Sequence, residues 1–399
     1  INISVLVTNN LYMQNINHII HSLSKPKVDR IHMACNMISS VSSYEEIQKI
    51  ADQMPSIHKG LFKFSYLKRK SYSHFNQVGY PIQSKSMFPY IWFITYIVEQ
   101  YSNEICNYLG LRKEYEENVL NGHYESARKN IRDINETIGY SYWGMEQTIK
   151  LERWAKDVNS SSQLSQKIIQ ENQKLSIFCN FYFNTSSVDF ASDDVKQIMH
   201  NLLSQMLKND ESFFQYFASL TIPYEWSFSG INWLQYYTQL SIVDLYNSLR
   251  DNIWKFDPQY LIGDFWKCIN LIVKLTKDPY LIKYLQIHNI ECSEHISNEE
   301  REAIVKLFCT QKYNGVIDMG ETYLSKNPTD FEIMDYVTKS YILTGKEYQL
   351  KSGHTNTIIN QIRDNYYIYL THNDQYKLAY KKLRTICIAM YSFHSCRYL

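Results

Sequence analysis

The chain has 399 residues but only 12 glycines and 8 prolines. This is about half of average usage, which disfavours turn-rich β architectures and favours long helices. Phosphate-binding loops of the GxGxxG or GxxxxGKS type and the GxSxG nucleophile elbow do not occur. The sequence therefore offers no signature of a nucleotide-binding enzyme or a serine hydrolase, and it predicts neither catalytic residues nor a cofactor.

Neither sign of charge dominates, because 41 basic residues face 40 acidic ones and the net charge is +1. No global field therefore attracts nucleic acid or an anionic membrane. The longest apolar stretch, residues 88–98, is about half as long as a bilayer requires. We expect a cytoplasmic chain without a membrane span. It begins with Ile1 and not with Met, which indicates a fragment, a processed form or a sequence that lacks its start.

The eight cysteines are scattered and form no CxxC pair, so we expect reduced, buried thiols and no disulfide framework. The densest group of metal-ligand types is His288, Cys292 and His295. A zinc site needs a fourth ligand in tetrahedral geometry, which Glu291 or Glu294 could supply. The alternative is a polar loop between helices with a buried cysteine. No metal site is predicted.

Hydrophobic residues make up 45% of the chain and aromatic residues 15%, with 34 tyrosines. This content is sufficient for a sizeable core and does not indicate disorder. We interpret the tyrosines as part of a helical core, since buried aromatic rings usually serve packing. The alternative interpretation is an aromatic binding surface.

The most informative stretch is Tyr313 to Gly345, which reads as two helices joined at an Asn-Pro-Thr corner. Pro328 cannot lie inside a helix and disfavours the helical conformation of the residue before it. Thr329 is then predicted as the N-cap of the second helix, with Glu332 as its capping-box partner. Gly345 is predicted to end that helix in the left-handed conformation.

Two further segments repeat one spacing of apolar residues. The sets are Tyr124, Ala127, Ile131, Ile134 and Tyr376, Ala379, Leu383, Ile386. Tyr313 and Val316 match the first two members, but Gly320 stands where the third apolar residue is expected. This pattern resembles the tetratricopeptide family over roughly a third of the chain. The resemblance implies helix pairs that bind a protein or peptide in a concave groove.

Residues 1–83 are predicted as a small α/β or α+β segment. Residues 1–9 are predicted as a strand and 61–75 as a strand or hairpin, while Ser43 is predicted to cap a helix that ends at Gln53. Three helical regions are predicted to follow, at 84–160, 161–280 and 281–399.

Within these regions a long helix over 86–109 is expected to end before Gly110. Residues 159–162 are expected to be a polar linker. The fold class is thus mainly α, a helical-repeat or irregular α-solenoid scaffold with a small mixed N-terminal segment.

Basic and aromatic residues interleave at 59–75, which is the clearest binding signal in the sequence. On a strand this order could place stacking rings beside phosphate contacts. The candidate nucleic-acid-binding residues are Lys63, Tyr66, Lys68, Arg69, Lys70 and Tyr72. The alternative is an ordinary half-buried strand with a solvated lysine face, which the low net charge favours.

The leading functional hypothesis is a non-enzymatic scaffold or accessory subunit that holds a protein partner or peptide in an intracellular complex. A bacterial antiviral defence system is one such setting. The alternatives are a nucleic-acid-associated protein that uses residues 59–75, and an enzyme whose active site is dispersed in the N-terminal region. The sequence does not indicate an oligomeric state.

Overall fold

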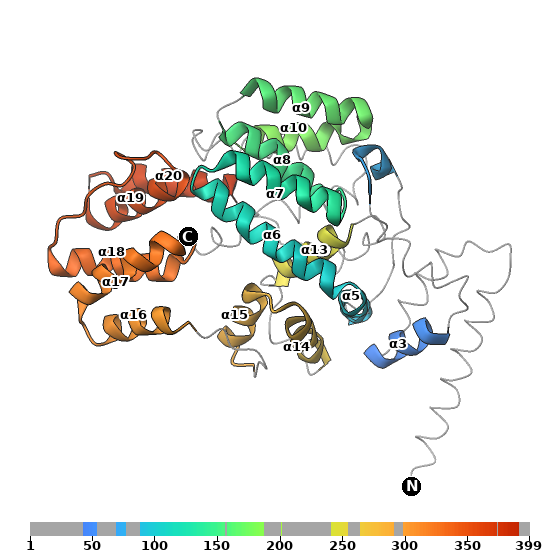
Figure 1. Ribbon diagram of the computed structural model, residues 1–399, viewed down its shortest axis with the longest axis horizontal. Helices are drawn as coiled ribbons and strands as arrows, with labels where there is room; N and C mark the ends of the chain where they lie inside the picture. Colours follow the sequence, from blue (N-terminus) through green and yellow to red (C-terminus); the bar gives the residue numbers. More distant parts are fainter. Residues whose placement is uncertain are drawn as a thin grey trace, which may run out of the picture. The chain divides into compact units, whose positions relative to one another are not determined.

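The computed structural model describes residues 43–53, 69–76, 88–155, 158–186, 201, 241–253, 264–290, 298–372 and 374–390. Within these ranges it contains fifteen α-helices, two short 3-10 helices and no strand (Figure 1). The predicted mainly α fold is therefore confirmed. None of the described helices combines the length and the apolar character needed to cross a membrane.

The predicted strands of residues 1–83 lie mostly outside the described residues. Where the structure describes this region, Tyr72–Asn76 forms the 3-10 helix η2, so the strand predicted over 61–75 is wrong at its C-terminal end. Tyr72 and Phe75 are both buried. Side chains three residues apart share a face in a 3-10 helix, whereas in a strand they point to opposite faces.

Contacts between Cα atoms divide the chain into two compact units, each assembled from three segments. Unit 1 comprises Ile1–Asn107, Ile138–Tyr142 and Trp226–Glu294, and unit 2 comprises Tyr108–Thr137, Trp143–Glu225 and His295–Leu399. Both units join segments that are distant in the sequence, whereas the predicted regions 1–83, 84–160, 161–280 and 281–399 are consecutive.

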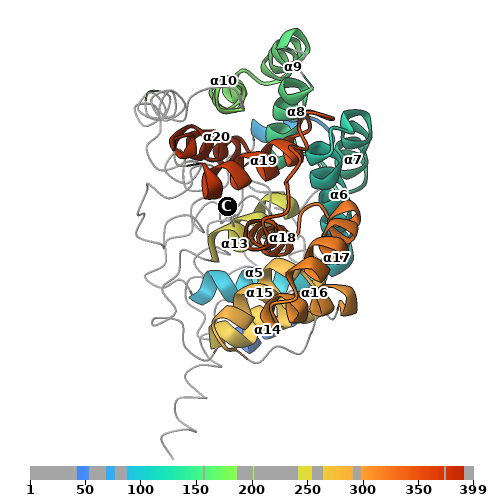
Figure 2. The same cartoon turned by 90° about the vertical axis from the view of Figure 1, so that its left-hand side faces the viewer.

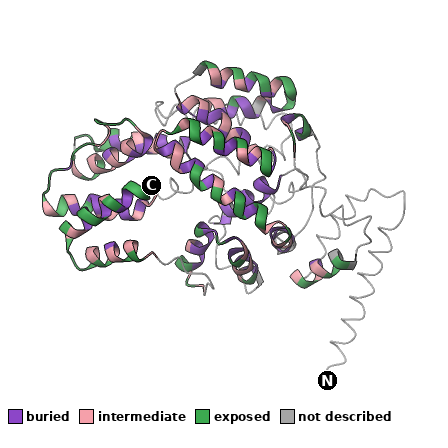
Figure 3. Cartoon of the chain, viewed as in Figure 1, coloured by how far each residue is buried: buried purple, intermediate pink, exposed green. Residues whose placement is uncertain are grey.

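Unit 1 is built around α5, which contacts α3, α13 and α14, while α14 also contacts α15. The bounds are α3 Tyr44–Gln53, α5 Phe88–Gln100, α13 Ile242–Asn252, α14 Asp264–Thr276 and α15 Pro279–Ile287. The sequence of α5 is apolar nearly all round, and seven of its ten described side chains are buried, while those toward its C-terminal end are less so (Figure 3). Such a helix belongs in the middle of a core.

Two helix starts in unit 1 follow from local chemistry. The hydroxyl of Ser43 accepts a hydrogen bond from the amide of Glu46 at 3.3 Å, which confirms the predicted cap of α3. Pro279 opens α15, and the side chain of Asp278 caps it by accepting from the amide of Tyr280 at 2.9 Å. Proline suits this first position because the helix does not need its amide there.

The long helix predicted over 86–109 is instead two helices that divide at Tyr101. The second, α6, spans Ser102–Leu120 and runs through Gly110, so the predicted end at this glycine is wrong. A Cβ atom on Gly110 would meet nothing within 4 Å. The glycine therefore has no packing role there, and the helix tolerates it.

In unit 2, α6 continues into α7, and α8 to α10 follow. The bounds are α7 Tyr124–Thr137, α8 Tyr142–Trp154, α9 Val158–Glu171, η3 Gln173–Leu175 and α10 Ser176–Thr185. On α7, Ala127, Ile131 and Ile134 are buried, as their spacing indicated. The first residue of α8, Tyr142, belongs to unit 1.

Residues 159–162, predicted as a linker, lie inside α9. Ser161 is fully buried, and its hydroxyl donates to the backbone carbonyl of Ile149 on α8 at 3.1 Å. Small polar side chains here serve close helix packing, which their composition alone did not reveal.

The C-terminal part of unit 2 contains α16 to α20. The bounds are α16 Glu299–Cys309, α17 Tyr313–Lys326, α18 Phe331–Thr344, α19 Ile358–Thr371 and α20 Tyr376–Ala389. Gly345 has φ 66° and ends α18 in the left-handed conformation, as predicted. We refer to residues 299–389 as the C-terminal array.

Candidate protein-interaction site

The helices of the C-terminal array pack in the order of the sequence. Each helix contacts the next one, and α16 also contacts α18 (Figures 1 and 2). An isolated helix pair of this kind cannot bury its apolar faces, and stacking with neighbouring pairs creates a continuous core. The contacts within the array thus follow the order of the helices in the sequence.

Helices α17 and α18 approach each other closely at Gly320. A Cβ atom on Gly320 would overlap Cγ2 of Val337, and it would lie 3.9 Å from Cγ2 of Ile333. Valine cannot easily turn away, because a β-branched side chain has one preferred rotamer in a helix. Gly320, which interrupts the apolar spacing in the sequence, is thus the point that lets the two helices meet.

An ionic network connects the starts of α16 and α18. Arg301 Nε lies 2.9 Å from Asp330 Oδ2, and the same guanidinium also binds Glu332. The Tyr323 hydroxyl donates to Asp330 at 3.1 Å. Burial, followed by the charge of Asp330, raises the pKa of Tyr323 to about 12. The network joins α16, α17 and α18 through one carboxylate.

The cap of α18 is displaced by one residue from its predicted position. Asp330, and not Thr329, caps this helix by accepting from the amide of Ile333 at 3.2 Å. Glu332 binds Arg301 instead of completing a capping box. Asn298 caps α16 by accepting from the amide of Arg301 at 3.0 Å. Adjacent residues that can both cap a helix cannot be ranked without their tertiary partners.

A second network connects α17, α18 and α19 through Glu321. Arg363 Nη2 donates to Glu321 at 2.7 Å, and the Tyr341 hydroxyl donates at 3.3 Å. Lys351 Nζ lies 3.5 Å from the other carboxylate oxygen. Burial, followed by the charge of Glu321, raises the pKa of Tyr341 to about 12. Successive helices of the array are thus linked by ionic contacts as well as by apolar ones.

The connection between α18 and α19 is held by the buried carboxylate of Asp364. It accepts from the amides of Lys351 and Ser352, both at 2.8 Å, and from the Tyr348 hydroxyl at 3.1 Å. Tyr348 also stacks on Tyr367 with ring centroids 4.3 Å apart. These contacts hold the thirteen-residue connection against α19, although it contains no helix or strand.

The outer surface of α19 and α20 is unusually apolar. Of ten exposed large hydrophobic residues among the described residues, five lie within residues 369–380. They are Tyr369, Leu370, Tyr376, Leu378 and Tyr380. Basic side chains occur between them on α20. We call this set, with Lys377, Lys381, Lys382 and Arg384, the α19–α20 surface.

Sequence reasoning used residues 376–386 only for their repeat spacing and overlooked this surface. The signal was present, because tyrosines and basic residues interleave over 376–384 as they do over 59–75. Only the structure shows which members of the segment are buried. Ala379, Leu383 and Ile386 form the packed stripe, while Tyr376 is exposed.

The predicted nucleic-acid site at 59–75 is described only in part. Lys63, Tyr66 and Lys68 lie outside the described residues. Arg69 has its guanidinium 4.4 Å from the centre of the Phe75 ring, and its Nη1 is 4.0 Å from Asp244. Tyr72 is buried edge-on against Tyr140, and Lys70 is exposed.

Arg69 and Tyr72 thus take part in packing within unit 1. These contacts favour the interpretation of 69–75 as a packed segment over a stacking platform. The binding prediction for the segment as a whole stays a prediction.

Of the candidate metal-ligand residues His288, Cys292 and His295, the structure describes only His288, because the other two lie outside the described residues. The His288 ring packs on Tyr284 with centroids 4.6 Å apart. In the described part of the chain, no three His, Cys, Asp or Glu residues come together as a metal site would require.

The described cysteines are free thiols. Cys179 and Cys268 are buried, as predicted for thiols in a helical core, whereas Cys106 and Cys309 are exposed. Burial raises the pKa of Cys179 and of Cys387 to about 12. The thiolate is the nucleophilic form, so these two cysteines are unsuited to nucleophilic catalysis at neutral pH.

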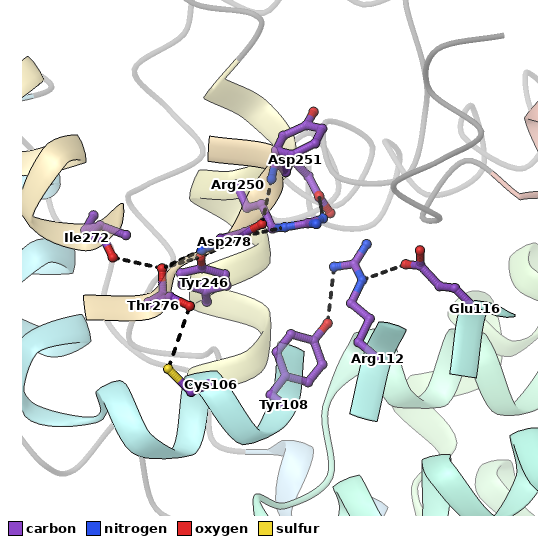
Figure 4. Close-up of polar contacts among 11 residues, drawn as sticks. Cys106, Tyr108, Arg112, Glu116, Tyr246, Arg250, Asp251, Ile272, Thr276 and Asp278 are labelled. Carbon is purple, nitrogen blue, oxygen red and sulfur yellow. Dashed lines mark hydrogen bonds and ion pairs between the residues drawn. The ribbon is translucent and has the colours of Figure 1, made fainter. Parts of the chain in front are cut away.

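Two buried charge clusters could be mistaken for active sites (Figure 4). In unit 1, Asp278 accepts from Arg250 Nε at 2.7 Å and from the Tyr246 hydroxyl at 2.8 Å, in addition to capping α15. The Arg250 guanidinium also lies over the Tyr280 ring, 4.6 Å from its centre. A carboxylate engaged by three donors is held as a structural anchor.

In unit 2, the buried Arg112 plays a comparable part along α6. Its Nε donates to Glu116 at 2.8 Å, and its Nη1 donates to the Tyr108 hydroxyl at 3.3 Å. The guanidinium lies 5.5 Å from the centre of the Trp143 ring on α8. This cluster likewise joins two helices, α6 and α8.

Comparisons with protein-family models, with curated proteins and with solved structures gave no match. Functional inference therefore rests on the geometry of the C-terminal array and its exposed residues.

Proposed function

We propose that this chain is a non-enzymatic interaction scaffold, and that the C-terminal array is a tetratricopeptide-like stack that holds a partner protein. The observation that carries the proposal is the packing of α16 to α20 in sequence order. Stacks of this kind expose extended surfaces along the whole series of helices, and such surfaces suit the binding of other chains.

The close contact at Gly320 supports the pairing of α17 with α18. Gly320 departs from the apolar spacing of the family, but its lack of a side chain leaves room for Val337 of α18. Helices that pack closely in pairs suit a tetratricopeptide-like stack.

The setting of the scaffold remains as the sequence suggested. We propose an accessory subunit of an intracellular complex, with bacterial antiviral defence as one such setting. The described charge clusters favour a scaffold over an enzyme, because each one connects helices.

Cross-linking in the native cell tests this proposal. The tagged full-length chain would be treated with a lysine-reactive cross-linker, purified and analysed by quantitative mass spectrometry. We expect one protein near equimolar amount, cross-linked to exposed lysines of the array such as Lys346, Lys377 and Lys381. Recovery of no protein near that amount, or cross-links confined to unit 1, would contradict the proposal.

A further inference from the structure

We infer that the α19–α20 surface binds an acidic protein segment that carries apolar anchor residues. This inference rests on the proposed scaffold function and specifies the chemistry of the partner. It starts from the exposure of five large apolar side chains within residues 369–380, of which Tyr376 and Tyr380 share one side of α20 and Leu378 lies on another. The exposed fractions are 72% for Leu378, 51% for Tyr380, 43% for Tyr376, 40% for Tyr369 and 37% for Leu370.

The spacing along α20 arranges these residues in stripes. Ala379, Leu383 and Ile386 are buried and fix the orientation of the helix. Tyr376 and Tyr380, four residues apart, share one stripe next to the buried one. Tyr380 meets Tyr369 of α19 with ring centroids 6.1 Å apart, so the aromatic stripe continues onto the neighbouring helix.

A basic stripe lies beside the aromatic one. Lys377, Lys381 and Arg384 are separated by four and three residues and so lie along one side of α20. The helix also contains Lys382 and has no acidic residue between Tyr376 and Ala389. The closest acidic residue in the sequence is Asp374, in the connection to α19. Charge complementarity therefore selects a negatively charged partner.

The aliphatic residues decide between the two classes of negatively charged partner. A single nucleic-acid strand gains affinity from aromatic stacking and phosphate contacts, to which leucine contributes little. Leu378 and Leu370 gain most from apolar side chains that bury them. An acidic segment with leucine or aromatic anchors buries the leucines and complements the positive charge of α20, whereas nucleic acid complements the charge and stacks on the tyrosines but leaves the leucines exposed.

The other end of α20 is firmly held, so the surface is well positioned. Lys150 on α8 donates from Nζ to the backbone carbonyl of Ala389 at 3.0 Å. A positive charge at the end of a helix also interacts favourably with the helix dipole. A surface on a fixed helix binds with a smaller loss of conformational entropy than one on a mobile helix.

A peptide selection tests the inference directly. The immobilised full-length chain would be presented with a displayed library of random sixteen-residue peptides. We expect the enriched peptides to combine Asp or Glu with Leu, Phe or Trp. Their binding, measured by fluorescence anisotropy, should weaken as salt is raised, since exposed charges are screened. Enrichment of basic peptides, or of none above the unmodified resin, would overturn the inference.

Two variants locate the binding surface. Lys377→Glu with Lys381→Glu, and separately Leu378→Asp, should each weaken binding of the selected peptides by about tenfold or more. The matched control is Lys306→Glu with Lys326→Glu, which makes the same charge change at exposed positions of α16 and α17. It should bind the peptides as the unmodified chain does. Equal binding by all four proteins would overturn the inference.

Two further measurements test the alternative occupants of the α19–α20 surface, which are a nucleic-acid strand and a second copy of this chain. A fluorescent oligothymidine that binds more tightly than the peptides, and loses binding in the Lys377→Glu, Lys381→Glu variant, would show a nucleic-acid surface. Light scattering that finds a dimer, converted to monomer by Leu378→Asp, would show self-association. Either result would overturn the inference.

The scaffold proposal is judged separately from this surface. If the cross-linked cellular partner still binds the charge-reversal variant, the scaffold stands and the acidic-segment inference fails. If no cellular partner is found but the selected peptides bind as expected, the scaffold proposal fails and the acidic-segment inference stands. Circular dichroism spectra that match the unmodified chain verify that each variant is folded.

Discussion

Helices α5 and α20 are of similar length, but they are used in opposite ways. Seven of the ten described side chains of α5 are buried, including Ile91, Phe93 and Ile97. On α20 one stripe is buried while its tyrosines, a leucine and lysines are exposed (Figure 3). The first is the centre of a core, and the second holds a stack together with one face only. A helix of the second kind has surface left for a partner.

The ion pairs of unit 1 and of the C-terminal array also differ in burial. In unit 1, Arg250 and Asp278 are buried and form an ion pair within the core. In the C-terminal array, Arg301 and Glu332 are partly exposed and connect helices at the edge of the stack. Loss of a buried partner is costly because the remaining charge cannot be solvated, whereas water replaces a partner at the edge. This difference is open to measurement.

The largest effect is expected at Asp278. Asp278→Ala removes the nearer of the two carboxylates that bind the buried Arg250, with only Asp251 at 3.5 Å remaining, and should destabilise unit 1 by about 3–5 kcal/mol. Hydrogen exchange of peptides from α13 to α15 measures the change in opening free energy. Adding Arg250→Met should restore part of the loss, because an uncharged side chain then fills the site. A loss below about 1 kcal/mol would show that the pair is not an anchor.

The next effect is expected at Gly320. Gly320→Ala forces Val337 and α18 away from α17, so we expect a loss of about 1–3 kcal/mol in the opening free energy of these two helices. Val337→Ala in the same chain should recover part of it. Gly110→Ala is the matched control, because it lies in a helix with nothing near its Cβ position. That control should stabilise α6 by about 0.5–1 kcal/mol.

A smaller effect should distinguish the two candidate caps of α18. Asp330→Ala removes the cap, the Arg301 pair and the Tyr323 hydrogen bond, and should cost about 1–2 kcal/mol in hydrogen exchange of α18. Thr329→Ala should cost less than about 0.5 kcal/mol. Equal losses would mean that the two residues share the capping role.

The smallest effect concerns alkaline pH. Tyr323 and Tyr341 have pKa values of about 12 in the array, above the ordinary value of about 10. Their contribution to stability is fully present below pH 10 and is lost as the pH rises toward 12, because the unfolded chain ionises first. Chemical unfolding at a series of pH values should therefore show a shallower alkaline loss for Tyr341→Phe. An unchanged slope would contradict this assignment.

Local features of the sequence were reliable where one residue had one suitable role. Gly345 ended α18 because only a residue that tolerates positive φ fits that position. The spacing of Ala127, Ile131 and Ile134 identified the buried stripe of α7. Such signals depend on the geometry of a single helix, which the sequence contains in full.

Features that depend on a second segment were missed or misplaced. Ser161 reads as linker composition, yet it is buried because α8 offers a carbonyl. Gly110 reads as a helix end, yet the helix continues through it. Arg250 and Asp278 lie 28 residues apart, and no local pattern joins them. On α20, the sequence alone does not distinguish the exposed apolar residues from the buried ones, because burial depends on where α19 packs.

The sequence by itself determined that this is a helical chain with a helix pair at Tyr313 to Gly345, because the periodicity of apolar residues and the helix-ending glycine act locally. Only the tertiary structure decided which polar residues became buried anchors, which helices stack, and which tyrosines and leucines stay exposed. Burial is a property of the neighbours that a residue meets, and those neighbours come from distant parts of the chain.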